Sequence, residues 1–197
     1  MEATKVLDKY RQRMFKATSK EDLMMMLGNA VKIIKYEEMK KYNTIQELLE
    51  PYQAVIMLYP NANHPEMGHW CCIFVMPGTS ILQYFDSYGI WVDKKVSDFN
   101  EKDKKVKMHE MTRMDATLTK LILESPYGDS TYWNDYPFQA DDIASCTCGL
   151  WCVIRLKCNH LNEEDFKEKF LDAPLGRNVL PDLLVSTMIC DMYPEKC

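Results

Sequence analysis

The sequence predicts an α+β fold, because helical patterns open the chain, strand-like apolar runs follow, and further helical patterns close it. Composition supports one folded domain, since 47% of the 197 residues are hydrophobic. The chain has only 7 glycines and 9 prolines, so long disordered stretches are not expected. We expect a single domain over residues 1–197, with a functional core over about 40–160 and an N-terminal helical elaboration over about 1–40.

Capping signals mark two short helices early in the chain. Ser19–Asp22 has the form of a capping box, and a helix through Leu23–Leu27 should follow. Thr44–Glu47 has the same form and should open a second helix that ends near Pro51.

Three apolar runs separated by turn residues predict strands over Ala54–Tyr59, Trp70–Met76 and Ile81–Phe85. Pro77-Gly78 lies between the last two runs, so these strands should form a hairpin. The aromatic segment Tyr132–Phe138 is expected to be a further short strand.

The second half of the chain contains four helical patterns. Ala116–Leu123 and Val179–Cys190 are expected to be helices, and Asn162 should cap a helix over Glu163–Leu171. The run Cys148–Cys158 is apolar nearly all round, which is typical of a helix buried on most sides.

Charge and targeting signals exclude some classes of protein. The formal net charge of −5 argues against a globally basic nucleic-acid binder, and the lysine-rich segment Asp98–Glu110 is expected to be a solvated loop or helix face. The charged N-terminus lacks the apolar region of a secretory signal, and no apolar run approaches the ~20 residues that span a bilayer. We expect a soluble protein with no membrane partner, made in a reducing compartment and not secreted.

The chain has 8 cysteines, so a disulfide framework and a structural zinc site are alternatives to consider. A chain of this length without a secretory signal does not suggest a disulfide framework. Cys148 and Cys152 have helical spacing and Cys146 lies two residues from Cys148, but no second pair completes a tetrahedral zinc site. Most of the cysteines are therefore expected to be small buried hydrophobic residues, and no metal is expected.

Cys148 has the local features of a catalytic thiol. It stands at the predicted start of the buried helix, where backbone N–H groups and the helix dipole favour a thiolate. Gly149 follows and allows another backbone to come close. The alternative is an ordinary core cysteine.

His69 and Asp86 are predicted to meet across the hairpin. His69 precedes the first hairpin strand and Asp86 follows the second, and antiparallel pairing places the start of one strand beside the end of the other. A base and the carboxylate that orients it require this proximity. Taken singly, His69 could be a surface-turn histidine and Asp86 a turn-capping aspartate.

Further residues are candidates for supporting roles in such a site. The Gln139 amide and the Cys148 backbone N–H are candidate donors to an oxyanion, although Gln139 is otherwise an ordinary loop residue. Trp70 is a candidate to shield the imidazole and, with Gly149, to border the substrate, although a core role is the simpler one. This chemistry requires no metal or organic cofactor.

These motifs resemble the adenain-type cysteine proteases, whose clan also holds the proteases that process ubiquitin-like proteins. The resemblance rests on four motifs in one order: Gly68–Trp70, Phe85–Gly89, Gln139 and Thr147–Cys152. The order of Thr44–Leu49, Ala54–Tyr59 and Tyr132–Asn134 around them is similar to the polinton and virophage branch of the family.

The resemblance implies a papain-like or adenain-like fold, with a central mixed sheet and the nucleophile at the start of the central helix. It implies a triad of Cys148, His69 and Asp86, with Gln139 at the oxyanion. It also implies a viral endopeptidase that cleaves capsid or core precursor proteins during virion maturation. We expect a monomer that acts in the virion and in the viral factory of the host cytoplasm.

The chain departs from the family in one spacing. The step from Gln139 to Cys148 is nine residues, which is longer than usual, so either the loop Ala140–Thr147 bulges or another residue serves the oxyanion. Cys146 would shorten the step, but it lacks the following glycine and the apolar helix. The acidic charge does not indicate a nucleic-acid activator, and no peptide activator is indicated either.

Other functions remain open at this point. The same catalytic residues suit a deubiquitinase or deSUMOylase acting on host modifiers, and a catalytically inactive capsid-associated scaffold of the same fold is a non-enzymatic alternative. A metal or redox protein built on the cysteines is another. A reversible disulfide from Cys148 to Cys146 or Cys152 would keep the enzyme inactive until reduced.

Overall fold

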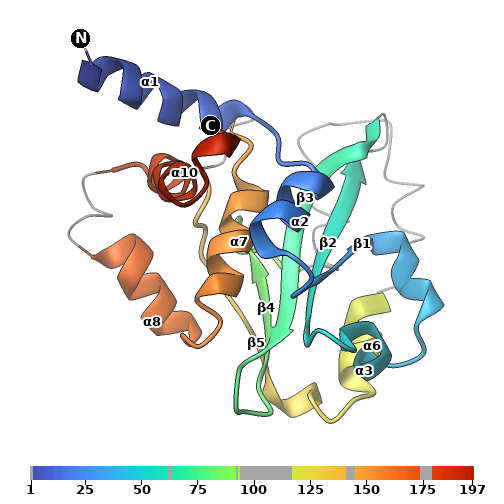
Figure 1. The fold of residues 1–197 in the computed structure, drawn as a ribbon. Coiled ribbons are helices and arrows are strands. Elements are labelled where there is room, and N and C mark those ends of the chain that lie inside the picture. Colours follow the sequence, from blue (N-terminus) through green and yellow to red (C-terminus); the bar gives the residue numbers. More distant parts are fainter. Residues whose placement is uncertain (1, 62–63, 92, 94–116, 141–144, 174–178) are drawn as a thin grey trace, which may run out of the picture.

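A five-stranded mixed sheet in the order β1-β2-β3-β4-β5 is the centre of the fold, and helices cover both of its faces (Figure 1). The structure is a computed structural model, and its helices and sheet confirm the predicted α+β class. The predicted polar segment Asp98–Glu110 lies outside the described residues. Those residues are 2–61, 64–91, 93, 117–140, 145–173 and 179–197.

The strand pairings confirm the predicted hairpin. Strands β2 (Ala54–Asn61), β3 (His64–Val75) and β4 (Leu82–Asp86) pair antiparallel with their neighbours. The outer strands β1 (Lys32–Lys35) and β5 (Thr131–Trp133) pair parallel with β2 and β4. The sheet therefore combines an antiparallel centre with parallel edges.

Two strands differ from the sequence predictions. Strand β1 lies within the first 40 residues, which were expected to be helical. It was not predicted, because its four residues are too few to show a strand pattern. The predicted strand Tyr132–Phe138 is regular only over Thr131–Trp133. Beyond it, the Tyr136 and Phe138 rings contact each other at 5.4 Å in a core cluster, and this packing replaces sheet pairing.

Helices form a layer on each face of the sheet. Trp70, Cys72 and Phe74 of β3 share a core cluster with the helix α7, whereas Cys71 and Ile73 belong to a second cluster on the opposite face. The first layer contains α1 (Glu2–Phe15), α2 (Lys20–Leu27), α7 (Cys148–Lys157), α8 (Glu163–Lys167), η3 (Glu168–Asp172), α10 (Pro181–Met192) and η4 (Pro194–Lys196). The second contains η1 (Tyr36–Lys41), α3 (Ile45–Leu49) and α6 (Thr117–Leu123), with η2 (Gly128–Ser130) just before β5.

The helices begin where the capping residues predicted. Ser19 and Asp22 form a reciprocal capping box, with bonds of 3.1 Å in each direction. The Thr44 hydroxyl accepts from a backbone N–H of the first turn of α3, and the Asn162 side chain does the same for α8. Helix α7 is buried along its length, as its apolar sequence predicts.

The chain ends are tied to one another and to the first helices. The Tyr10 hydroxyl of α1 donates to Asp191 of α10 at 3.0 Å, and the Lys196 ammonium lies 2.7 Å from the Asp22 carboxylate. A disulfide joins Cys190 to Cys197, which the sequence analysis did not predict. None of the described helices is long and apolar enough to cross a membrane.

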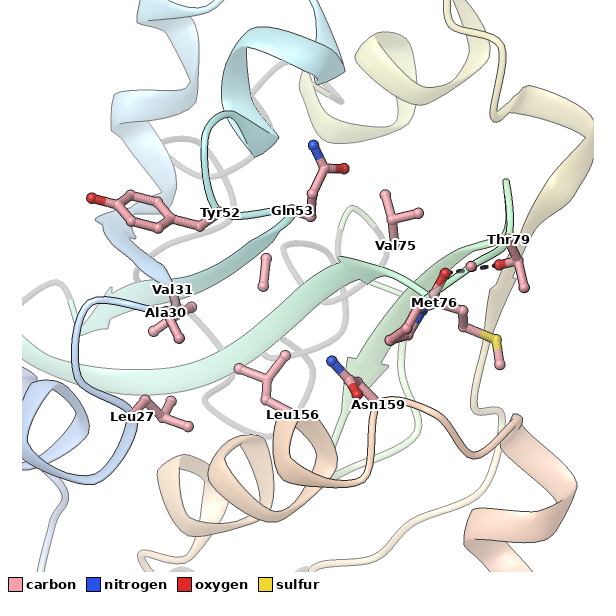
Figure 2. Close-up of a pocket in the computed structure, with 13 residues that line it drawn as sticks. Leu27, Ala30, Val31, Tyr52, Gln53, Val75, Met76, Thr79, Leu156 and Asn159 are labelled. Carbon is pink, nitrogen blue, oxygen red and sulfur yellow. Dashed lines mark hydrogen bonds between the residues drawn. The ribbon is translucent and has the colours of Figure 1, made fainter.

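A cavity of about 360 Å³ lies at the far end of α7 from its first residue (Figure 2). Aliphatic side chains such as Leu27, Val75 and Leu156 line it, together with the Met76–Thr79 turn and Asn159. Because α7 rises about 1.5 Å per residue, its two ends are well separated. This cavity therefore lies away from Cys148.

Replacing Gly149 by alanine should destabilise the fold. The added methyl group would lie 2.7 Å from Thr18 Cβ and 3.1 Å from Trp70 Cδ1, and the rigid Thr18 Cβ cannot easily move aside. We expect the free energy of unfolding to fall by about 1–3 kcal/mol, measured by urea denaturation. Gly128→Ala is the control, because its methyl group would meet no atom closer than 3.4 Å. Equal stability of the two variants would contradict this account.

Candidate active site

Cys148 is the first residue of α7, and its sulfur lies at the positive end of that helix. The side chain is 8% exposed. The backbone N–H groups of Gly149 and Trp70 both donate to the sulfur. The geometry therefore favours a negative charge on Cys148.

His69 and Asp86 lie together across the hairpin, as predicted, but His69 lies within β3 and Asp86 is the last residue of β4, rather than both lying just outside the strands. Asp86 pairs with Cys71 in the β3–β4 register, so His69 is its diagonal neighbour two residues away. Nε2 of His69 lies 3.1 Å from Oδ2 of Asp86. His69 is 9% exposed and Asp86 is fully buried, so this contact is shielded from water.

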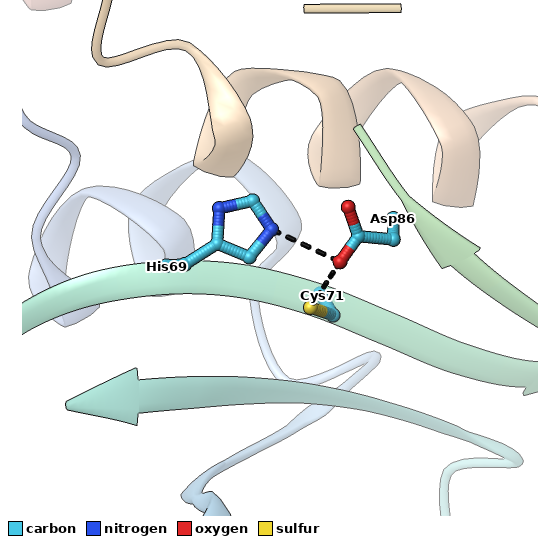
Figure 3. A group of neighbouring side chains, drawn as sticks. All are labelled: His69, Cys71 and Asp86. Atoms are coloured by element: carbon cyan, nitrogen blue, oxygen red, sulfur yellow. Dashed lines mark hydrogen bonds and ion pairs between the residues drawn. The ribbon is translucent and has the colours of Figure 1, made fainter. Parts of the chain in front are cut away.

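The Asp86 carboxylate receives several further hydrogen bonds. The Cys71 thiol donates to Oδ2 at 3.0 Å, so Nε2 and Sγ are directed at the same oxygen (Figure 3). The Tyr84 hydroxyl also reaches Oδ2, at 3.4 Å, and the Tyr88 N–H donates to Oδ1 at 2.7 Å. These donors satisfy both carboxylate oxygens and fix the side chain in one orientation.

The Asn134 side chain fixes the backbone of Asp86 from the neighbouring segment. Its Oδ1 accepts from the Asp86 N–H at 3.0 Å, and its Nδ2 donates to the Asp86 carbonyl at 2.6 Å. Asn134 belongs to the aromatic–Asn segment noted in the sequence, but no catalytic or positioning role was predicted for it. Asparagine can satisfy both backbone groups at once, which explains this residue type.

His69 connects the carboxylate to the sulfur. The Cys148 side chain hydrogen-bonds to His69. Because Nε2 faces Asp86, Nδ1 is the ring nitrogen left for the sulfur. The Tyr88 ring stacks on the imidazole, with centroids 4.9 Å apart and planes 27° from parallel. The structure thus brings together Cys148, His69 and Asp86.

The surroundings lower the pKa of Cys148 below the ordinary thiol value. Burial alone raises this pKa, but the charge and hydrogen bond of His69 and the two backbone N–H donors outweigh it. Burial instead keeps the pKa of Cys146, Cys152 and Cys158 raised. Cys148 is therefore distinguished from these three cysteines as a candidate nucleophile.

Gln139 lies beside this centre but its amide is already bonded. Its Oε1 accepts from the Ser87 hydroxyl at 2.8 Å, and its Nε2 donates to the Ser145 carbonyl at 3.0 Å and to the Tyr88 hydroxyl at 3.2 Å. The residue is 2% exposed. Part of the long loop to Cys148, residues 141–144, lies outside the described residues.

A buried aspartate that the sequence analysis missed holds both ends of that loop. Asp182, in the first turn of α10, accepts a hydrogen bond from the Thr147 hydroxyl and another from the Ala140 N–H, the latter at 3.0 Å. Thr147 directly precedes Cys148, and Ala140 directly follows Gln139. The position after Pro181 at a helix start is a weak signal, and nothing in the sequence indicates these partners.

The end of α1 and the linker to α2 pack beside the start of α7. The Cys146 N–H donates to the Met14 carbonyl at 2.8 Å, and the Trp70 indole N–H donates to the Thr18 carbonyl at 2.8 Å. Trp70 is only 5% exposed, so its ring packs in the interior and offers little surface to a substrate. Gly149 is likewise buried, against Thr18. Both residues thus have a packing role in this structure.

The cysteines near Cys148 have other partners. The Cys152 thiol hydrogen-bonds to Cys72 of β3, which contributes, after burial, to its raised pKa. Cys146 is half-buried, and the negative charge of Cys148 adds to the effect of burial in raising its pKa. The predicted disulfide from Cys148 to Cys146 or Cys152 is not formed in this structure.

Comparison with known proteins places the chain among virophage proteins. The chain is 36% identical over 178 residues to Uncharacterized protein V9 of Sputnik virophage, and the aligned region covers 88% of this chain and 93% of that protein. The chain belongs to the same family as this virophage protein. No model of a protein family matches the chain. This relationship agrees with the resemblance of the sequence to virophage proteins. The name of the relative does not indicate a catalytic activity.

Cys148 should react with iodoacetamide at lower pH than Cys146, Cys152 and Cys158. Its lowered pKa leaves more thiolate near neutral pH, whereas burial keeps the pKa of Cys146 raised. His69→Ala removes the largest lowering influences while burial remains, so the pH profile of Cys148 should move upward. Peptide mass spectrometry of alkylated protein measures both sites in one sample. Faster labelling of Cys146, or an unmoved profile in the variant, would contradict the assignment.

Proposed function

We propose that this chain is a cysteine endopeptidase with an adenain-like fold that cleaves viral capsid or core precursor proteins during virion maturation. One observation carries the proposal. The His69 imidazole joins the buried Asp86 carboxylate on one side to the Cys148 sulfur on the other, and that sulfur lies at the positive end of a buried helix.

Each step of peptide hydrolysis has a group to perform it. Cys148 transfers its proton to His69, and the Nε2–H···Asp86 contact stabilises the resulting imidazolium. The thiolate attacks the scissile carbonyl, and the imidazolium then protonates the leaving amine. Water attacks the thioester with His69 as the base and releases the acyl product.

The oxyanion that forms in each step needs donors already in place. The Cys148 backbone N–H lies at the start of α7, where it has no partner within the helix. Gln139 supplies the second donor if its amide exchanges one of its present bonds for the oxyanion. The contact of Gln139 with Ser145, three residues before Cys148, supports this role and favours Gln139 over another residue.

Virophage membership supports a viral substrate. A chain related over most of its length to a virophage protein is expected to act on proteins of the same particle or its host cell. The adenain-type resemblance favours the particle proteins. We propose action in the virion and the viral factory, on protein substrates, as a monomer and without a cofactor.

Removal of a ubiquitin-like modifier is the enzymatic alternative, and a modifier-derived activity probe separates it from precursor cleavage. Strong labelling of Cys148 by a probe that carries ubiquitin or a related modifier would favour the alternative. An inactive scaffold would react with neither the probe nor a thiol reagent at Cys148. The lowered pKa of Cys148 argues against that outcome.

Cys148→Ala should abolish cleavage of capsid or core precursors co-expressed with the chain. The substitution removes the only atom that attacks the carbonyl, so product should fall to the uncatalysed level. Cys146→Ala is the matched control, because Cys146 lies two residues away and its pKa is raised. We expect the control to retain cleavage. Cleavage that survives in Cys148→Ala would rule out the assignment.

Asp86→Asn should lower kcat/KM by about 100-fold, less than Cys148→Ala does, because it impairs the orientation of the base rather than removing the nucleophile. An amide cannot accept all the bonds that the Asp86 carboxylate accepts, so it also weakens the stabilisation of the imidazolium. Cleavage of a peptide substrate measures the loss, and circular dichroism checks folding. A folded Asp86→Asn variant as inactive as Cys148→Ala would refute an orienting role.

A further inference from the structure

Three potential metal ligands converge at the hairpin, on the side of His69 that faces away from the nucleophile. The ligand atoms of His69, Cys71 and Asp86 all lie within 4.8 Å of one another. Nε2 and Sγ lie 3.1 Å and 3.0 Å from the same carboxylate oxygen (Figure 3). Neighbouring ligand atoms around a tetrahedral zinc ion are on the order of 3.5 Å apart. Small side-chain rotations therefore suffice to surround an ion.

The charges of these groups also suit a divalent cation. Two protons, from the thiol and from the imidazole, now point at one buried oxygen. A divalent cation that replaces these two protons would balance the charges of the Cys71 thiolate and the Asp86 carboxylate. With the neutral His69 imidazole as the third ligand, the site would carry no net charge. Buried sites tolerate such neutral complexes far better than unpaired charge. Nitrogen, sulfur and oxygen ligands together favour zinc over magnesium or calcium.

A buried hydroxyl without a partner lies beside this group. Tyr59 is the residue of β2 that pairs with His69. Its hydroxyl oxygen is buried and has no hydrogen-bond partner among the described residues. Its side chain lies on the same face of the sheet as His69 and Cys71, because residues paired across antiparallel strands point to one face. A zinc ion held by three protein ligands binds a water molecule as its fourth ligand. That water would give the Tyr59 hydroxyl the hydrogen-bond partner that it now lacks.

We propose that His69, Cys71 and Asp86 form a zinc-binding site, and that zinc bound there switches the peptidase off. Binding forms bonds from Zn²⁺ to Nε2, Sγ and Oδ2. The thiol proton is released to solvent, and the imidazole proton moves from Nε2 to Nδ1 by exchange with solvent, so the bound imidazole is neutral. With Nε2 on the metal, the imidazole no longer alternates between its neutral and charged forms. The inhibitory part rests on the proposed function, whereas binding itself does not.

Metal binding is tested on the full chain carrying Cys148→Ala, which removes any site made by the nucleophile and His69. Co²⁺ is used in place of zinc because its complexes absorb visible light. Displacement of the bound Co²⁺ by Zn²⁺ then gives the zinc affinity. We expect one Co²⁺ per chain with a thiolate-to-cobalt absorption band. Adding Cys71→Ser keeps a donor to Asp86 but should weaken binding by at least about 100-fold and remove the band. Adding Cys72→Ala is the matched control, because Cys72 faces α7 on the opposite side of the sheet.

The outcomes separate this site from the peptidase. Unchanged Co²⁺ affinity in the Cys71→Ser variant, or affinity that does not rise with pH as the thiol proton is released, would overturn the site. In the chain with Cys148 intact, Zn²⁺ should inhibit peptide hydrolysis, and Cys71→Ser should relieve that inhibition relative to its own zinc-free rate. If zinc leaves the rate of peptide hydrolysis unchanged, the claim that bound zinc inhibits the peptidase is wrong. Binding with no hydrolysis under any condition would refute the proposed function while the metal site stands.

Discussion

The buried carboxylate of Asp86 is the group on which the arrangement of the hairpin depends. A buried charge without partners costs several kcal/mol, so the donors around it cannot be lost singly without a large penalty. His69 and Cys71 come from β3, and the Tyr88 N–H comes from the turn after β4. Asn134 holds the backbone of the same residue from beside β5. The strand register, the turn and the orientation of the imidazole are therefore linked through one side chain.

The Cys148 thiol is positioned by segments far away in the sequence. Asp182 of α10 holds Thr147, directly before Cys148, while the carbonyl of Met14 holds Cys146. Helices α1 and α10 also contact each other, so both supports belong to one packed layer. The N-terminal helices are consequently part of the machinery that places the thiol, rather than an addition to a core that begins near residue 40. A disturbance of either terminus should therefore be transmitted to the start of α7.

The sequence predicted those parts of the structure that depend on local pattern. The central strands followed from long apolar runs, and the contact of His69 with Asp86 followed from the geometry of an antiparallel hairpin. Strand β1 was missed because Lys32–Lys35 has only two apolar residues between lysines, and its pairing with β2 depends on tertiary contacts. Asp182 could not be assigned to the loop before Cys148, because its contacts with that loop are also tertiary. Residue type and spacing carry no information about which distant segments a buried carboxylate will meet.

In the proposed peptidase, the present bonds of Gln139 indicate what a substrate has to displace. Gln139 has two amide hydrogens, and the Ser145 carbonyl and the Tyr88 hydroxyl accept both of them. To donate to an oxyanion, the amide has to release one. The bond to Tyr88 is the longer of the two, and the same tyrosine ring covers the His69 imidazole. A substrate that displaces the Tyr88 side chain would therefore free a hydrogen of Gln139 and uncover His69 in one movement. In the proposed mechanism, Tyr88 would therefore couple the release of the Gln139 amide to the exposure of His69.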